Sequence, residues 1–192
     1  MALFDAFLKL DGIKGESADA KHKGEIDIES FSWGMSQTGV SATGGGGGAG
    51  KVKVHDIVVT KRTDASSPLL MLNCANGAHI KEGLLTVRKA GGTQLEFLKI
   101  KLTDILVSSY KPHGSIIASD DWEQSATTGN TTSQDDWESK VITTSGGTEI
   151  PSESISLNFS KVEFSYQAQG ADGKAQGGPV LAGWDVKANQ KV

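Results

Sequence analysis

The stretch GLLTVRKAGGTQLEFLKIKLTDILVSSY, Gly83–Tyr110, decides the fold. Two apolar runs flank Ala90–Thr93, where glycines permit the positive φ of a tight turn, so the stretch predicts a β-hairpin. Its second strand is apolar on both faces, with Leu98, Ile100, Leu102 and Leu106 on one and Leu95, Phe97, Ile105 and Val107 on the other. A lone antiparallel sheet keeps one wet face, so this strand predicts a second covering layer: another sheet, a helix or a neighbouring subunit.

Three further segments alternate as strands but change phase partway along. In Glu25–Trp33, Ile26 and Ile28 share one face, whereas Phe31 and Trp33 fall on the other. Similar changes occur between Val54 and Ile57, and between Phe159 and Val162 in Ser154–Tyr166. Such changes indicate bulges, or strands that serve two different buried surfaces. Leu3–Leu10 and Gly178–Val186 read as an additional first and last strand, the latter with Val180, Ala182, Trp184 and Val186 on one face.

One segment, DASSPLLMLNCANG, predicts a short helix. Ser67 is a suitable N-cap, Pro68 suits the first helical position, and Asn76–Gly77 suits the end. So short a helix needs packing to persist, which we expect from Leu69, Leu72 and Cys74. Many strands and one short helix predict an all-β barrel or sandwich, and the 192 residues suit a single domain.

The composition argues against several classes of protein. The net charge of −4 does not favour nucleic-acid binding, which requires a basic face. The single cysteine, Cys74, cannot form an internal disulfide. The start MALFDAFLKLDG carries Asp5 and Lys9 in its apolar part and does not resemble a signal peptide, and no apolar run is long enough for membrane insertion. We expect a cytosolic product that would leave the cell only by a route without a classical signal.

The stretch TGGGGGAGKVKV, Thr43–Val54, satisfies half of a phosphate-binding loop, G-x-x-x-x-G-K. Such a loop also needs Ser or Thr after the lysine and a following helix. Val52 follows Lys51, and the next residues alternate as a strand, so we reject a nucleotide site. The glycines are more typical of a long loop between strands, here 39–50.

The segment Lys111–Glu149 differs from the rest of the chain. It is rich in Ser, Thr, Gly and Asp and carries seven acidic residues and two lysines, a net charge of −5. The tetrad Asp-Asp-Trp-Glu occurs twice in it, as Asp120, Asp121, Trp122, Glu123 and as Asp135, Asp136, Trp137, Glu138. The tetrads fit a Ca²⁺ site, a partner-docking hairpin, or a solvated hairpin with packed tryptophans, which we favour because no ligand pattern is complete.

No pattern of catalytic residues is visible. The histidines His22, His55, His79 and His113 lack the spacing of metal ligands, and no G-x-S-x-G elbow occurs. We therefore expect no enzyme, no cofactor and no metal, and the strands with two apolar faces indicate self-assembly.

A string of motifs over roughly three quarters of the chain resembles the Hcp (haemolysin-coregulated protein) family of the bacterial type VI secretion system. They are FLKLDGIKGES, HKGEIDIESFSWGMSQTG, GGGGGAGKVKVHDIVVTK, ASSPLLMLNCANGAHIKEGLLTVRKAGG, EFLKIKLTDILVSSY, ESISLNFSKVEFSYQAQ and GGPVLAGWDV. The resemblance implies a two-sheet β-barrel with one helix, like that of phage tail-tube proteins. Six copies would close into a ring, and rings would stack into a tube.

The resemblance also implies partners and sites. The tube assembles in the cytoplasm and is expelled by a contractile sheath beneath a spike (VgrG-type) protein, and its lumen carries small effector proteins. Ser30 and Ser32 point away from Phe31 by alternation, and we place this pair on the lumen wall as effector-binding residues. The family's glycine-rich region helps rings meet, which assigns ring–ring contact to Gly44, Gly45, Gly46, Gly47, Gly48 and Gly50.

The chain departs from the family at 111–149, where a short loop is usual. If this insertion projects along the ring axis it opposes stacking, and if it projects radially it could reach the sheath. Two alternatives therefore stay open: a ring that does not stack and serves as an adaptor for one effector, and a monomeric β-sandwich that binds Ca²⁺ or sugar. A prophage tail-tube origin is a further possibility.

Overall fold

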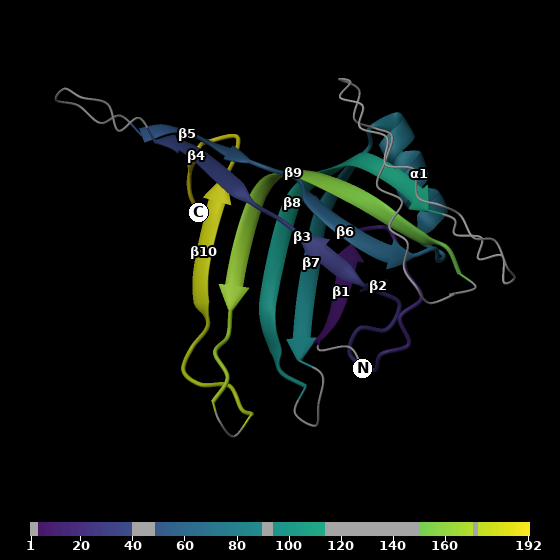
Figure 1. Cartoon of the computed structure of the whole chain (residues 1–192), viewed down its shortest axis with the longest axis horizontal. Coiled ribbons are helices and arrows are strands. Elements are labelled where there is room, and N and C mark those ends of the chain that lie inside the picture. The colour runs from purple at the N-terminus through teal and green to yellow at the C-terminus, as the bar shows by residue number, and fades with distance from the viewer. Residues whose placement is uncertain (1–3, 40–48, 90–93, 114–149, 171–172) are drawn as a thin grey trace, which may run out of the picture.

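The computed structural model describes residues 4–39, 49–89, 94–113, 150–170 and 173–192 (Figure 1). Its elements are β1 (Phe4–Leu10), β2 (Ile26–Ile28), β3 (Ser30–Ser32), β4 (Met35–Gly39), β5 (Ala49–Val54), β6 (Ile57–Arg62), α1 (Ser67–Asn76), β7 (His79–Lys89), β8 (Glu96–His113), β9 (Ser152–Tyr166), β10 (Val180–Asp185) and β11 (Gln190–Lys191). The fold is mostly β with one short helix, as predicted.

Nine of these strands form one sheet, in the order β11-β10-β9-β8-β7-β1-β2, with β6 attached to both β9 and β3. β4 and β5 form a separate two-stranded sheet. The hairpin predicted from Gly83–Tyr110 is confirmed, because β7 pairs antiparallel with β8 and Leu85 lies opposite Ile100. The turn residues Ala90–Thr93 lie outside the described residues.

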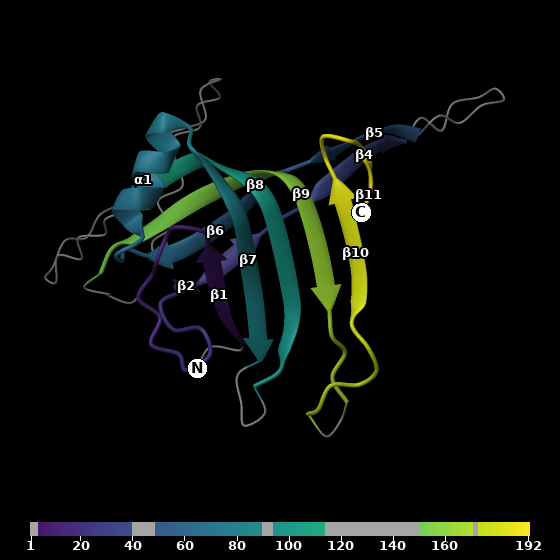
Figure 2. The same ribbon diagram turned by 180° about the vertical axis from the view of Figure 1, so that it is seen from behind.

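The described strands do not form the closed barrel that we predicted. The large sheet curls round the core (Figure 2), and β2 pairs with β1 whereas β3 pairs with β6. β2 and β3 are consecutive segments separated by Glu29, whose N–H donates to the carbonyl of Thr60 at 2.8 Å. The phase change read from Glu25–Trp33 is therefore a change of pairing partner, and the part of the chain that the structure describes has no ladder between β2 and β6.

The change between Val54 and Ile57 marks the end of β5 and the start of β6, which belong to different sheets. The change between Phe159 and Val162 lies level with similar changes in β7 and β8. Ile80, Ile105 and Phe159 face one another across β7, β8 and β9 and are buried, as are Gly83, Leu102 and Val162 three rows further along. The two rows between these sets are not buried. Both sets therefore reach the same core. Leu102 and Ile105, which strict alternation places on opposite faces of β8, lie on the same side of the sheet, so no second sheet is needed to cover them.

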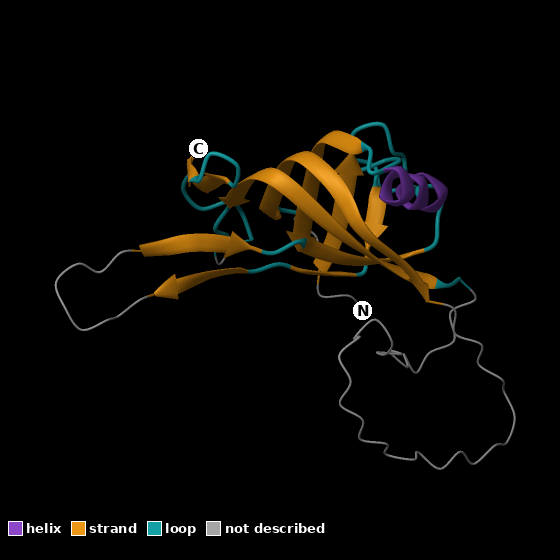
Figure 3. Cartoon of the chain, turned by 90° about the horizontal axis from the view of Figure 1, so that it is seen from above, coloured by secondary structure: helices purple, strands orange, loops and turns teal. Residues whose placement is uncertain are grey.

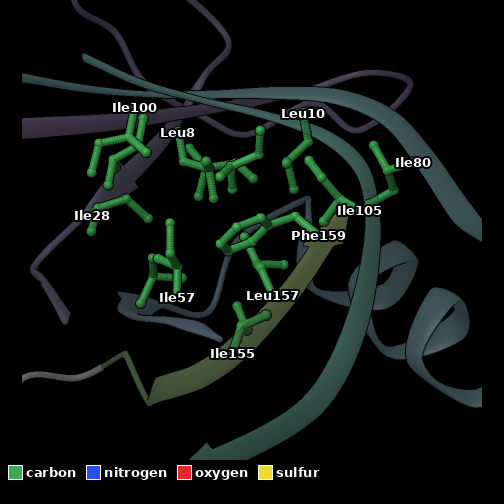
Figure 4. Packing of buried hydrophobic residues seen from close by; sticks show 14 of the residues in the cluster. Leu8, Leu10, Ile28, Ile57, Ile80, Ile100, Ile105, Ile155, Leu157 and Phe159 are labelled. Atoms are coloured by element: carbon green, nitrogen blue, oxygen red, sulfur yellow. The ribbon is translucent and has the colours of Figure 1, made fainter. Parts of the chain in front are cut away.

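A single cluster of buried side chains fills the space inside the curled sheet (Figure 4). It includes Leu8 from β1, Ile57 from β6, Ile100 from β8 and Leu157 from β9, each at most 1% exposed. Burying apolar surface is the main favourable term in folding. Strands from both halves of the sequence thus share one core.

The helix forms as predicted but turns a different face to the sheet. It ends at Gly77, whose φ of +66° is a left-handed conformation that glycine adopts without strain. Ser66, not Ser67, is its N-cap, and the Ser66 side chain makes no cap hydrogen bond. The prediction that Leu69, Leu72 and Cys74 pack inward is wrong for both leucines, because Leu70 is the residue that is buried, at 1% exposure, while Cys74 is half-buried.

The elements are arranged along one long axis. The β4–β5 hairpin and β10 lie at one end of the molecule, and α1 lies at the other (Figures 1 and 3). Strand β9 runs between them, because its first half pairs with β6 and its second half pairs with β10. The two ends are accordingly far apart in space.

Candidate assembly surfaces

Large apolar side chains are exposed mainly in two groups at these opposite ends. The helix-end cluster consists of Leu69, Met71, Leu72 and Ile150, and the β10-end cluster consists of Met35, Tyr166, Val180, Leu181 and Val192. Val180 and Leu181 are the most exposed members of these two clusters, at 70% each. Exposed apolar side chains that gather at one end of a folded chain indicate a surface that binds another protein.

A buried polar network holds α1 in place at the helix end. The Lys61 ammonium lies 2.6 Å from Glu153 Oε1 and 2.8 Å from Asp64 Oδ1, and both Lys61 and Glu153 are fully buried. The Ser67 hydroxyl, in the first turn of α1, donates to Glu153 Oε1 at 2.8 Å. The network therefore ties the start of the helix to β6 and to the first residues of β9.

Tyr110 of β8 completes this network. Its hydroxyl donates to Glu153 Oε2 at 2.8 Å. Burial, with the hydrogen bond to Glu153 and the charge of its carboxylate, raises the pKa of Tyr110 to about 12. Both strands that border the insertion thus contribute a side chain to one buried cluster.

At the opposite end an open groove of about 660 Å³ lies between the β4–β5 hairpin and the sheet. Met35 and Val52 of the hairpin line one wall, and Phe164, Ala182 and Trp184 line the other. The lining is mainly apolar. The indole N–H of Trp184 is buried and has no hydrogen-bond acceptor among the described residues.

The outer edge of β10 borders this groove and is largely unpaired. β11 pairs only with Trp184 and Asp185, and Gly183 accepts a further hydrogen bond from the Val192 N–H at 3.2 Å. Within the ranges that the structure covers, no strand pairs with Val180–Ala182 on that side. An apolar, unpaired strand edge is a surface on which another chain can pack.

The residues predicted for the lumen and for ring contact lie on neighbouring elements. Ser30 and Ser32 are exposed on β3, and Phe31 between them is half-buried, as the alternation predicts. Gly50 lies in β5, so the glycine-rich loop is shorter than 39–50 at both ends, since β4 also includes Gly39. Gly44, Gly45, Gly46, Gly47 and Gly48 lie outside the described residues.

The predicted insertion also begins later than the sequence suggested. Lys111–His113 belong to β8 and pair with Ser152–Ser154 of β9, so β8 is a long strand of 18 residues. The tetrads Asp120–Glu123 and Asp135–Glu138 lie outside the described residues. The described chain leaves and re-enters the sheet close to α1, because the Thr63 N–H donates to the carbonyl of Pro151 at 2.8 Å.

Asp104 is a structural residue that sequence reasoning missed. It has a φ of +56°, uncommon for a residue other than glycine, and lies where β7, β8 and β9 change phase. Its carboxylate binds Lys187 and Ser160 at 2.5 Å and His79 at 2.6 Å. These three partners, Lys187 first, hold the pKa of Asp104 well below its usual range.

Arg88 is another charged residue whose structural role the sequence pattern did not reveal. It is 3% exposed in β7 and donates to Asp19 at 2.8 Å and to Asp5 at 2.9 Å. The hydrogen bond from Arg88 is the main reason that the pKa of Asp19 falls to about 2. Arg88 thus fastens the segment between β1 and β2 to the sheet.

Neither a metal site nor a membrane span is found in the described part of the chain. In the described ranges, no three His, Cys, Asp or Glu residues are placed to hold a metal ion. Over the same ranges, no helix has the length and apolar character needed to cross a bilayer.

A curled, mostly β chain that exposes apolar side chains at two ends has the features of a protein that binds other proteins. Sequence comparison matches residues 7–166 to the family described as "Type VI secretion system effector, Hcp". The chain is 42% identical over 186 residues to Protein hcp1 of Pseudomonas aeruginosa, with 96% of each chain covered. The chain therefore belongs to the Hcp family, as its motifs predicted.

Solved structures agree with this assignment. Hcp1 from Salmonella typhimurium is 33% identical, with all of each chain covered and a TM-score of 0.71. Another structure, described as a type six secretion system protein, is 29% identical over 98% of this chain and 99% of the other, with a TM-score of 0.78. Hcp is a structural, non-enzymatic family of secreted tube proteins, so the predictions of secretion and of no enzyme are confirmed.

Proposed function

We propose that this protein forms hexameric rings that stack into the inner tube of a type VI secretion system. The observation that carries the proposal is the pair of exposed apolar clusters at opposite ends of the chain. A closed ring needs two different complementary surfaces on each copy, whereas a two-fold dimer needs only one. The ring would complete the tube wall that the open, curled sheet of one chain leaves incomplete.

In this proposal the whole chain, 1–192, is one domain, and its partners are those of a secretion tube. One buried cluster drawn from both halves of the sequence supports a single domain. The tube assembles in the cytoplasm, beneath a spike (VgrG-type) protein and inside a contractile sheath, and leaves the cell through the machine.

The lumen surface would include Ser30 and Ser32, and it would carry small effector proteins. Both side chains are small, polar and exposed on β3, which suits weak and reversible contact with cargo. Ser32→Gln should weaken the protection of a co-expressed effector while the ring mass stays unchanged. Equal effector stability with both proteins would contradict this placement.

The β4–β5 hairpin and the insertion would make the remaining contacts. The hairpin extends away from the body (Figure 3), which suits ring–ring contact through Gly50 and the adjacent Gly44–Gly48. The acidic tetrads at Asp120–Glu123 and Asp135–Glu138 would dock a partner such as the sheath. Deletion of 120–138 should leave rings intact and remove one partner only.

The experiment that tests the proposal is the mass in solution by light scattering on a sizing column, with negative-stain images. Six chains of 20.1 kDa give about 121 kDa. A particle of that mass with a central hole is the expected result. A monomer at high protein concentration would contradict the ring and favour a monomeric binding domain.

A further inference from the structure

We propose that His22 is a proton-dependent latch, which holds the segment between β1 and β2 against the outer face of the sheet when its imidazole is charged. We call this segment, residues 11–25, the strap (Figure 2). The latch lies within one copy of the chain, so it does not depend on the proposed ring.

The strap covers a patch of the sheet that faces away from the core. Leu8 and Leu85 lie opposite each other and belong to the core cluster, so their neighbours Phe7 and Thr86 point to the other face. Phe7 and Thr86 are nonetheless buried, at 4% and 2% exposure. The ring of His22 stacks on that of Phe7, with centroids 4.2 Å apart and planes at 9°. The strap therefore closes over a small second cluster outside the main core.

His22 lies between two carboxylates and is only 6% exposed. Its Nδ1 is 2.9 Å from Glu25 Oε2 at the end of the strap, and its Nε2 is 3.5 Å from Glu96 Oε1 at the start of β8. Nε2 is buried and has no hydrogen-bond partner among the described residues. Glu96 is thus the group that can join His22, and the strap with it, to β8.

A neutral imidazole does not suit this position. It carries one N–H and one lone pair, on opposite nitrogens. If Nδ1 carries the hydrogen, the Nε2 lone pair faces the Glu96 carboxylate, and if Nε2 carries it, the Nδ1 lone pair faces Glu25. Only the imidazolium can donate from both nitrogens, so a proton on His22 makes both contacts attractive.

The charges around His22 favour the imidazolium, although burial alone would disfavour it. They come from the strap, β1, β7 and β8 and comprise four carboxylates and three cations: Asp5, Asp19, Glu25, Glu96, Lys21, Arg88 and Lys99. A charged His22 balances this set, whereas a neutral His22 leaves an excess negative charge.

Glu96 stays ionised while His22 titrates. The hydrogen bond from Lys99, 2.7 Å away, is the main cause that lowers the pKa of Glu96, and the charges of His22 and Lys21 lower it further. Histidine side chains, in contrast, change charge between about pH 5 and pH 8. A carboxylate therefore faces the ring throughout the range in which His22 gains or loses its proton.

The folded chain places two carboxylates beside the His22 proton, so protonation stabilises the fastened strap. This stabilisation is present at mildly acidic pH and is lost as the pH rises toward about 8. The protein belongs to a secreted family, and the strap would be fastened most firmly where the surroundings are acidic.

The test is hydrogen exchange of the strap amides in the full chain at about pH 5.5 and about pH 8, the two sides of the histidine range. Labelling times are scaled for the effect of pH on chemical exchange, and light scattering verifies that the mass is the same at both pH values. Protection of the strap should fall by roughly threefold to tenfold at the higher pH, the factor that one net hydrogen bond contributes to local opening.

Three variants separate the latch from simple packing. Glu96→Gln supplies an amide N–H that can donate to the Nε2 lone pair of a neutral imidazole, so its strap should stay protected at the higher pH. His22→Gln removes the titrating group, and its strap should be equally protected at both pH values. His79→Gln alters an exposed histidine that pairs with Asp104 elsewhere in the sheet, and this matched control should keep the wild-type response.

Equal protection of the wild-type strap at both pH values would overturn the latch. So would a loss of protection in Glu96→Gln as large as that in the wild type, because a histidine that only fills space would not respond to this change. If His22→Gln fails to fold, the comparison of Glu96→Gln with the wild type still decides the outcome.

Discussion

The two ends of the molecule both expose apolar side chains, but they are built in different ways. At the α1 end a fully buried ion pair, Lys61 with Glu153, lies beneath the exposed leucines. At the β10 end the last strand pairs on one side with β9 and only partly with β11 on the other, and a groove lies beside it. The exposed side chains at the α1 end thus rest on a buried polar network, whereas those at the β10 end accompany an unpaired strand edge.

The largest effect should come from the buried ion pair. Lys61→Met leaves the Glu153 carboxylate buried without its cation, so the free energy of unfolding should fall by roughly 3–5 kcal/mol. The measurement is urea unfolding under conditions where light scattering reports a monomer. The neighbouring Arg62→Met removes an exposed pair with Glu29 (3.0 Å), which should change stability by less than about 1 kcal/mol. Equal losses of unfolding free energy in Lys61→Met and Arg62→Met would contradict the expectation that the buried pair contributes more than the exposed pair.

The two faces of α1 should respond differently to truncation. Leu70→Ala opens a cavity in the core and should cost about 2–5 kcal/mol of unfolding free energy. Leu72→Ala removes an exposed side chain and should change the stability of the monomer by no more than about 0.5 kcal/mol. If Leu72→Ala were as destabilising as Leu70→Ala, the helix would face the sheet differently from the structure described.

Alkaline pH should weaken the α1 end in particular. The folded pKa of Tyr110, about 12, lies above its ordinary value of 10.0, so the folded state holds this proton more tightly than the unfolded state. The stabilisation is fully present below pH 10 and is lost as the pH rises toward about 12.

Unfolding free energies measured across that pH range should therefore fall in the wild type, and Tyr110→Phe should reduce the fall. Tyr166→Phe, at the β10 end, is the matched control and should leave the fall in place. If the unfolding free energy of Tyr110→Phe fell with pH as steeply as that of the wild type, other groups would be the cause of the alkaline loss.

The smallest effect on the monomer should come from the β10 end. Val180 is 70% exposed, so Val180→Ser should alter the unfolding free energy of the monomer by no more than about 0.5 kcal/mol. The same change should weaken ring formation, which light scattering at decreasing protein concentration measures. A large loss of monomer stability would mean that β10 packs more closely in the chain than its exposure indicates.

Local signals predicted local structure well. The glycine at position 77 ended the helix as expected, and the phase changes in Glu25–Trp33 and Ser154–Tyr166 marked real changes in the strands. The choice of Leu69 and Leu72 as the inward face failed because four consecutive apolar residues, Leu69–Leu72, cover all sides of the helix, and tertiary packing selects Leu70. Periodicity cannot rank the faces of a helix that is apolar on every side.

The buried charges could not be predicted, for a different reason. Lys61 and Glu153 are 92 residues apart, and each alone reads as an ordinary polar position in a strand. Only the pairing of β6 with β9 brings them together, and no local pattern encodes it. The candidate surfaces are likewise set by which ends of the sheet remain uncovered, which follows from topology.

The pairing of β6 with β9 also affects the order in which the chain can fold. After Lys61 leaves the ribosome, 92 more residues must be made before its partner exists, which takes roughly 5 to 20 s at common rates of synthesis. Contacts between distant parts of a sequence form slowly even in a complete chain. Until β9 arrives, the apolar edges of β6 and β8 stay open, so a newly made chain is most prone to pair wrongly just before its last strands are added.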